Sequence, residues 1–193
     1  MELQELGRGL WRWKARHPEW EPRREEDDPA DWSPEVGCVA YEAGETLVLI
    51  DPLVSAGDYQ SLDALVQAKA EVSILTTIKF HRRSREELTQ RYDATTEVPE
   101  GVEAIEIDGA QETMYWIGEH AALVPGDRIL GDRAPGLRMC PPSWLRYIEG
   151  YSQGDLRDAL RAAVLPLPVE QVLVSHGEPV LEDGHAALAR ALA

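Results

Sequence analysis

Four polar positions in this sequence each follow a short apolar run of the kind that forms a buried strand. Asp51 follows TLVLI, Asp127 follows ALVPG, and His176 follows QVLVS. The fourth is the segment TTIKFHRRS at residues 76–84, which ends another apolar run and carries His81. α/β domains place their binding groups at strand ends. The sequence therefore predicts a binding site that uses these carboxylate and imidazole side chains.

The first half of the chain predicts strands that alternate with helices. Gly44 marks the turn of a β-hairpin, and the hairpin's second strand is apolar almost throughout, which indicates burial on both faces. Ser84 and Glu87 are spaced as a capping box at a helix start. The expected strands are residues 36–41, 46–50 and 72–76, and the expected helices are residues 58–70 and 84–92. This order is typical of a layered α/β domain.

The second half predicts a meander of short strands followed by a strand and helices. The expected strands are residues 102–107, 114–117, 120–124 and 171–175, and the expected helices are residues 156–164 and 184–192. Residues 131–143 are rich in Gly and Pro and predict a loop. Before the hairpin, the first residues could begin a strand or a short helix, and the charged segment 21–31 predicts a loop.

Length and composition predict one globular domain over residues 1–193, with 44% hydrophobic and 28% charged residues. No apolar run approaches the roughly 20 residues that cross a bilayer, and the N-terminus has no signal-peptide core. A cytoplasmic protein is therefore expected. Cys38 and Cys140 lack metal-site spacing and predict buried free thiols.

The net charge of −16 bears on the kind of partner. A nucleic-acid-binding protein normally carries a basic face, and anionic membranes attract basic surfaces as well. Both nucleic acid and membrane are therefore disfavoured as partners. A small-molecule ligand stays open, and so does the oligomeric state.

Four segments in this order resemble the metallo-β-lactamase superfamily: LVLIDP, ILTTIKFHRRSREEL, HAALVPGDRILGD and VLVSHGEPV. In that family, a strand ending in LID precedes a strand ending in LTHxHxDH, a later strand ends in GD, and the last strand ends in a histidine followed by glycine. The resemblance covers the chain from about Val36 onward. It implies a four-layer αββα sandwich and hydrolase-like chemistry at a metal site.

The metal motif is where the sequence departs from the family. Thr77 and Lys79 stand at its first two histidines, His81 at its aspartate and Arg82 at its last histidine. The mid-chain histidine is replaced by Ala110 in the best register. Zinc requires nitrogen, sulfur or carboxylate ligands, so the family's dinuclear centre is not expected.

Three metal-ligand candidates survive in the resemblance: His81, Asp127 and His176. Two imidazoles and one carboxylate could hold a single zinc or other divalent ion, with Asp51 supporting the site from behind. The alternative is a metal-free site, in which Asp127 caps its loop through backbone N–H groups and His176 stays neutral. The sequence favours no cofactor and leaves a single ion as the alternative.

Three functions follow from these alternatives. The first is a non-catalytic member of the fold that binds a small ligand or a partner in the former active-site cleft, where Lys79 and Arg82 would bind an anionic ligand. The second is a mononuclear metal-dependent hydrolase of ester, lactone, thioester or amide bonds. The third is metal-independent catalysis with His81 as general base, for which no matching nucleophile motif exists.

Other residues around the predicted site receive weaker assignments. Lys79 and Arg82 belong to a basic cluster that either lines the substrate lip or forms a solvated helix start; its other members are Arg83, Arg85 and Arg91. Trp144 could line a pocket, and surface positions are expected for His17 and His185.

Overall fold

The computed structural model describes residues 1–21, 32–55, 57–132 and 136–193. Its strands are β1 (Gln4–Gly7), β2 (Leu10–Arg16), β3 (Glu35–Ala43), β4 (Thr46–Ile50), β5 (Glu71–Leu75), β6 (Glu103–Ile107), β7 (Glu112–Ile117), β8 (Ala122–Val124), β9 (Ile129–Gly131), β10 (Leu137–Met139) and β11 (Gln171–Val172). Its α-helices are α1 (Gln60–Val66), α2 (Arg85–Tyr92), α3 (Gln153–Val164) and α4 (Gly184–Ala191). Three short 3-10 helices are η1 (Lys79–His81), η2 (Gly118–His120) and η3 (Pro142–Leu145).

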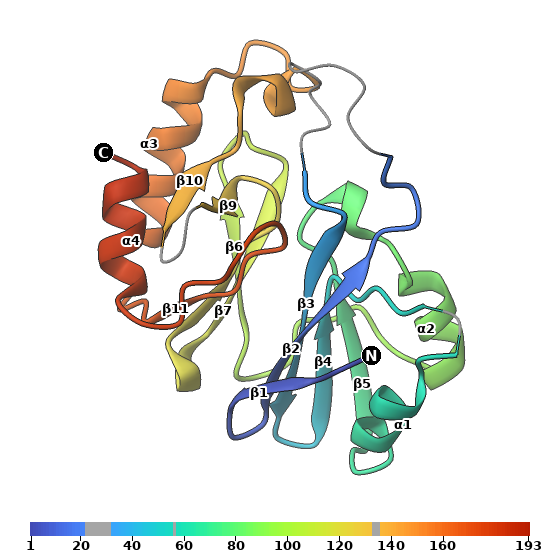
Figure 1. The fold of residues 1–193 in the computed structure, drawn as a ribbon. Helices are drawn as coiled ribbons and strands as arrows, with labels where there is room; N and C mark the ends of the chain where they lie inside the picture. The colour runs from blue at the N-terminus through green and yellow to red at the C-terminus, as the bar shows by residue number, and fades with distance from the viewer. Residues whose placement is uncertain (22–31, 56, 133–135) are drawn as a thin grey trace.

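Nine of these strands form two large sheets that face each other between two layers of helices, and β9 and β10 form a separate two-stranded sheet (Figure 1). One sheet has the order β1-β2-β3-β4-β5, and the other has the order β11-β8-β7-β6. Helices α1 and α2 cover the outer face of the first sheet, and α3 and α4 cover the outer face of the second (Figure 1). The predicted four-layer αββα sandwich is confirmed.

The short apolar strand β4 contributes side chains to two hydrophobic cores, one on each face of its sheet. Leu47 and Leu49 pack into the core under α1 and α2, whereas Val48 and Ile50 pack into the core between the sheets. Side chains alternate between the two faces of a strand, so a strand in the middle of four layers must be apolar at every position. The predicted burial of this strand on both faces is confirmed.

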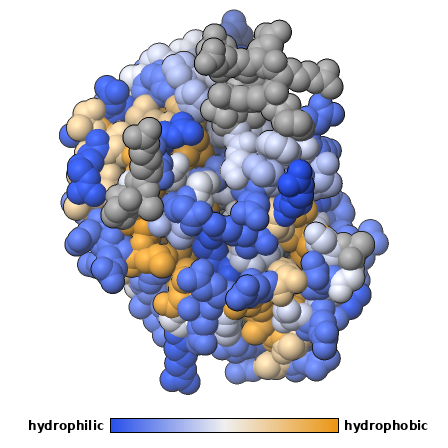
Figure 2. All heavy atoms as spheres, viewed as in Figure 1, coloured by the Kyte–Doolittle hydropathy of each residue, from blue (hydrophilic) through white to orange (hydrophobic). Residues whose placement is uncertain are grey.

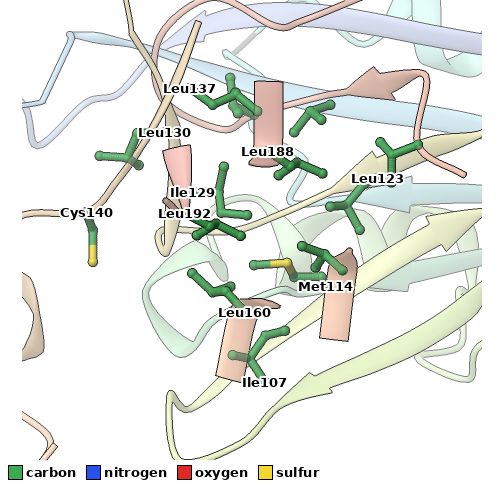
Figure 3. Close-up of a cluster of buried hydrophobic side chains, with 14 of the residues drawn as sticks. Ile107, Met114, Leu123, Ile129, Leu130, Leu137, Cys140, Leu160, Leu188 and Leu192 are labelled. Carbon is green, nitrogen blue, oxygen red and sulfur yellow. The ribbon is translucent and has the colours of Figure 1, made fainter. Parts of the chain in front are cut away.

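The third core lies between the second sheet and its helices (Figure 3). Met114 and Leu123 of the sheet meet Leu160 of α3 and Leu188 of α4. All four side chains are fully buried. Burial of a leucine or methionine side chain contributes about 1.5–3 kcal/mol, so this core fixes the frame that carries Asp127 and His176.

The structure corrects two local predictions. Ser84 is the N-cap residue of α2, but no side-chain cap hydrogen bond forms. Its hydroxyl instead accepts a hydrogen bond from the backbone N–H of Val54 at 3.0 Å, which ties the helix start to the segment after β4. Residues 131–143 are not all loop, because β10 pairs with β9.

The N-terminal residues, for which the sequence left strand and helix open, form an antiparallel hairpin of β1 and β2. Most of the predicted loop at residues 21–31 lies outside the described residues.

The face shown in Figure 2 is mostly hydrophilic, with hydrophobic side chains in separate patches. Within the described residues, every helix is too short or too polar to cross a lipid bilayer. Cys38 and Cys140 are free and buried, as predicted. The cytoplasmic location stays a prediction.

Candidate metal centre

Asp51 and Thr77 follow two parallel neighbouring strands, β4 and β5, so they meet at one edge of the sheet. The backbone N–H of Thr77 donates to Asp51 Oδ1 at 2.9 Å, and its hydroxyl donates to Asp51 Oδ2. Asp51 is buried and has a left-handed backbone with φ 50°, which aspartate tolerates better than most residues. Thr77 therefore positions Asp51.

His81 ends the 3-10 helix η1 and lies between two carboxylates. Its Nδ1 is 2.8 Å from Asp51 Oδ2, and its Nε2 is 3.0 Å from Asp127 Oδ1. A carboxylate at Nδ1 fixes the tautomer with the proton on that nitrogen and directs the Nε2 lone pair away from it. Asp51 thus orients His81 toward Asp127, from the position behind the site that the family resemblance implied.

A buried carboxylate, Glu112, holds the loop that carries Asp127. It accepts hydrogen bonds from the backbone N–H groups of Gly126 at 3.1 Å, Asp127 at 2.6 Å and Arg128 at 3.0 Å. Burial and the charge of Asp127 raise the pKa of Glu112 to about 7. Sequence reasoning missed Glu112, whose role depends on the loop that follows the neighbouring strand β8.

His176 follows β11 in a segment that bridges the two sheets. Ser175 accepts a backbone hydrogen bond from Gly37 N at 2.7 Å, and its hydroxyl accepts from Arg83 Nη2 at 2.6 Å. His176 Nε2 lies 3.3 Å from Asp127 Oδ1. The rings of Trp32 and Trp144 pack edge-on against His176, with centroids 5.5 and 5.7 Å away.

The side chains of His81, Asp127 and His176 are therefore brought together, and they are all buried. One ligand atom from each lies within 4.8 Å of the other two. Although two imidazole nitrogens lie nearby, Asp127 Oδ1 accepts no hydrogen bond from any described residue. A buried carboxylate oxygen without a partner is costly, and either a bound ion or a protonated imidazole would compensate it.

The charges at the site are strongly coupled. Burial would lower the pKa of His81, but Asp127 and Asp51 outweigh it and raise this pKa to about 9. Burial would raise the pKa of Asp127, but the imidazoles of His81 and His176 hold it well below its usual value. Burial lowers the pKa of His176, which favours the neutral imidazole that a metal requires.

The donor spacing can be tested against a metal ion. Zinc binds imidazole nitrogen and carboxylate oxygen at about 2.0–2.2 Å, so two ligands at right-angle to tetrahedral geometry lie roughly 2.9–3.4 Å apart. Asp127 Oδ1 lies 3.0 Å from His81 Nε2 and 3.3 Å from His176 Nε2. Both separations from Asp127 therefore fit one divalent ion, and the two imidazole nitrogens lie within 4.8 Å of each other.

A cavity of about 360 Å³ opens beside these three side chains. Its lining contains the two tryptophans that pack against His176, together with other aromatic, charged and polar side chains: His17, Glu19, Phe80, Arg83, Arg128, Ser143, Arg146 and Tyr147. Trp144 lines a pocket, as the sequence suggested. His17, for which a surface position was expected, lies on the cavity wall 5.0 Å from the ring of Trp32.

The structure places the members of the predicted basic cluster in different environments. Arg83 lines the cavity, and Arg91 pairs with Asp63 of α1 at 2.6 Å. Arg82 is largely exposed and lies 4.0 Å from Glu86, and neither Arg82 nor Lys79 is among the lining residues. Ligand binding by Lys79 and Arg82 stays a prediction.

Comparison with protein-family models and with curated proteins gave no match. Solved structures gave matches over nearly the whole chain. DIM-1 metallo-β-lactamase exposed to ceftazidime aligns with a TM-score of 0.64 at 12% identity, covering 99% of this chain and 94% of that one. The chain has the metallo-β-lactamase fold.

Two further metallo-β-lactamase-fold structures are described as mono-zinc forms. FIM-1 from Pseudomonas aeruginosa aligns with a TM-score of 0.63 at 11% identity, and the NDM_FIM-1 like enzyme from Erythrobacter litoralis aligns with 0.62 at 12% identity. Each alignment covers 99% of this chain and 94% of the other. At this level of identity the likeness establishes the fold alone, and the chemistry depends on the site's own residues.

Proposed function

We propose that the protein is a mononuclear metal-dependent hydrolase in which His81, Asp127 and His176 hold one divalent ion, with zinc as the first candidate. The observation that carries this proposal is the environment of Asp127 Oδ1. This oxygen is buried, lies close to two imidazole nitrogens, and accepts no hydrogen bond from the described residues. An ion bound by the three side chains would satisfy it.

The number of ligands supports a catalytic rather than a structural site. Structural zinc sites use four protein ligands, whereas catalytic ones use three and leave a position open. Here three side chains border the cavity, and within the described residues no other group of His, Cys, Asp or Glu converges in this way. When bound, the ion would supply Lewis-acid polarisation of a scissile carbonyl and activation of water.

The reaction class is hydrolysis of an ester, lactone, thioester or amide. Cleavage adds the hydroxyl of water to the acyl carbon and a proton to the departing oxygen, sulfur or nitrogen. Asp51 keeps His81 in the correct tautomer, and Trp32 and Trp144 shield His176 from solvent. Thr77 donates its hydroxyl to Asp51, which supports one ion rather than two.

The second candidate is a non-catalytic protein that binds a small ligand in the same cavity without a metal. One observation favours it: His81 lies between the carboxylates of Asp51 and Asp127, where a protonated imidazole is stabilised. An imidazolium would neutralise part of the negative charge without any ion. Metal content separates the two candidates.

The first experiment measures metal stoichiometry. The full chain is expressed without a histidine tag, dialysed against metal-free buffer and analysed by plasma mass spectrometry before and after addition of Zn²⁺. We expect one ion per chain, lost in Asp127→Asn and His176→Ala and retained in His185→Ala, which removes an exposed imidazole. A metal-free protein whose melting temperature is unaffected by chelator and by Zn²⁺ supports the second candidate.

The second experiment measures turnover on a panel of simple esters, lactones, thioesters and anilides. Activity in the metal-loaded protein, absent from the chelated protein and from His176→Ala, supports the hydrolase. Turnover that survives both chelation and His176→Ala would refute it.

A further inference from the structure

Two exposed aromatic rings meet at the edge of the cavity. Phe80, in η1, is 52% exposed and Tyr147, after η3, is 57% exposed. Their ring centroids are 5.8 Å apart, and both residues line the cavity. Two exposed aromatic side chains in contact at the lining of a cavity provide an apolar surface on which a ligand can pack.

A cationic side chain lies over each ring of this pair, in a cation–π contact. Lys79 Nζ lies 5.0 Å from the centroid of the Phe80 ring, and Arg146 Cζ lies 4.9 Å from that of Tyr147. Arg146 Nη2 also donates to the Tyr147 hydroxyl at 2.7 Å. Among the residues that the structure describes, neither cation forms an ion pair with a carboxylate.

The charge of these cations contrasts with the rest of the molecule. The chain has a net charge of −16, so a pair of neighbouring cations differs in sign from the molecule as a whole. Arg146 lines the cavity and Lys79 neighbours the lining residue Phe80, so together they create a local attraction for an anion. The flat faces of the aromatic pair favour a flat partner, because stacked and edge-to-face ring contacts are stronger than burial alone provides.

We call Phe80, Tyr147 and their two cations the mouth of the cavity. The same cavity is also lined by Trp32 and Trp144, which pack against His176. A ligand that rests on the mouth therefore extends along an aromatic wall toward the three metal-ligand candidates. The recognition elements at the mouth and the reactive groups inside belong to one cavity.

We propose that this cavity selects small aromatic carboxylates, whose ring packs on Phe80 and Tyr147 and whose anionic group pairs with Lys79 and Arg146. This substrate class rests on the proposed hydrolase function. In such a substrate, the cleaved bond would join the aromatic carboxylate portion to an acyl group that reaches His176. N-acylated aromatic amino acids have this chemistry.

Calorimetric titration with three matched probes tests the recognition. 3-Phenylpropionate has the ring and the charge, 3-phenylpropanol lacks the charge, and 3-cyclohexylpropionate lacks the flat ring. We expect 3-phenylpropionate to bind about tenfold more tightly than either of the others. Equal binding of all three probes, or no binding of 3-phenylpropionate at millimolar concentration, would overturn the proposal.

Variants locate the binding site. Phe80→Ala/Tyr147→Ala and Lys79→Gln/Arg146→Gln should each weaken 3-phenylpropionate binding by about tenfold. Matched controls are Val98→Ala/Leu181→Ala, which trims exposed apolar side chains elsewhere, and Arg157→Gln/Arg190→Gln, which removes exposed charge elsewhere. Unchanged binding in the mouth variants, or an equal loss in the controls, contradicts the proposal.

Titrations with and without Zn²⁺ separate this proposal from the metal centre. Probe binding that needs Phe80 and Tyr147, in a protein that takes up no Zn²⁺, would support the recognition site and refute the mononuclear hydrolase. Metal binding without any aromatic-carboxylate preference would do the reverse.

Discussion

A carboxylate oxygen of Asp51 lies 2.8 Å from Nδ1 of His81, on the opposite side of the ring from Asp127. This relationship joins the end of β4 to the candidate metal centre. Metal-ligating histidines commonly donate their second N–H to such a carboxylate, which fixes the ring and raises the basicity of the ligating nitrogen.

Asp51→Asn should weaken Zn²⁺ binding by about 10–100-fold, because the amide stabilises the required tautomer of His81 less well. Asparagine tolerates the left-handed backbone at this position, so the fold should persist. The dissociation constant is measured by competition with a chromophoric chelator. Asp158→Asn, on the exposed face of α3, is the control. Unchanged affinity in Asp51→Asn would show that Asp51 does not act on the metal site.

Glu112→Gln should destabilise the protein by about 1–3 kcal/mol, because the amide accepts the three backbone N–H groups less well and places donors against them. The measurement is the free energy of unfolding in urea. Glu103→Gln, an exposed glutamate of β6, should leave it nearly unchanged. Equal stability of the two variants would mean that the loop carrying Asp127 does not depend on Glu112.

Gly126→Ala should also be destabilising, because an added Cβ would lie 2.6 Å from Thr77 Oγ1 and 2.8 Å from Glu112 Oε2. Crowding of this kind costs about 1–3 kcal/mol, and here it also displaces the hydrogen bonds around Asp51 and Asp127. In Gly154→Ala the nearest atom would be 3.5 Å away, so the helix α3 should gain stability. Thermal unfolding compares the two, and a neutral Gly126→Ala would contradict the packing described.

Metal-free protein should lose stability as pH rises from about 6.5 to about 9. The pKa of His81 is raised from 6.5 to about 9 in the folded state, where burial opposes the effect and Asp127 and Asp51 overcome it. Its stabilising contribution is fully present below pH 6.5 and is lost as pH rises through 9. We expect the melting temperature in chelator to fall by roughly a few °C across this range. A flat profile, or a loss that persists in His81→Gln, would assign the effect elsewhere.

The layers and the strand ends could be predicted from sequence because their signals are local. The run TLVLI is apolar at nearly every position, and in the structure β4 packs on both faces. Asp51, Asp127 and His176 each follow an apolar run; the sandwich brings Asp127 and His176 to one cavity and places Asp51 behind His81, as the family resemblance implied. His81 was identified through the same resemblance, although its residue type differs from the family motif.

What sequence could not predict depends on contacts between distant segments. Phe80 and Tyr147 are far apart in the chain and meet only because η1 and η3 approach the same cavity. His17 reaches the wall from a hairpin whose strand character the sequence left open. Ser84 had the spacing of a cap, but a tertiary hydrogen bond from Val54 uses its hydroxyl instead. Such competition is invisible to a local pattern.

Trp32 and Trp144 contact the His176 ring within 5.7 Å. Indole emission is sensitive to protonation or coordination of a neighbouring imidazole, so these rings form an intrinsic optical reporter on the cavity. Titrating metal salts or small-molecule libraries into unlabelled protein should therefore report ligand binding without a labelled substrate.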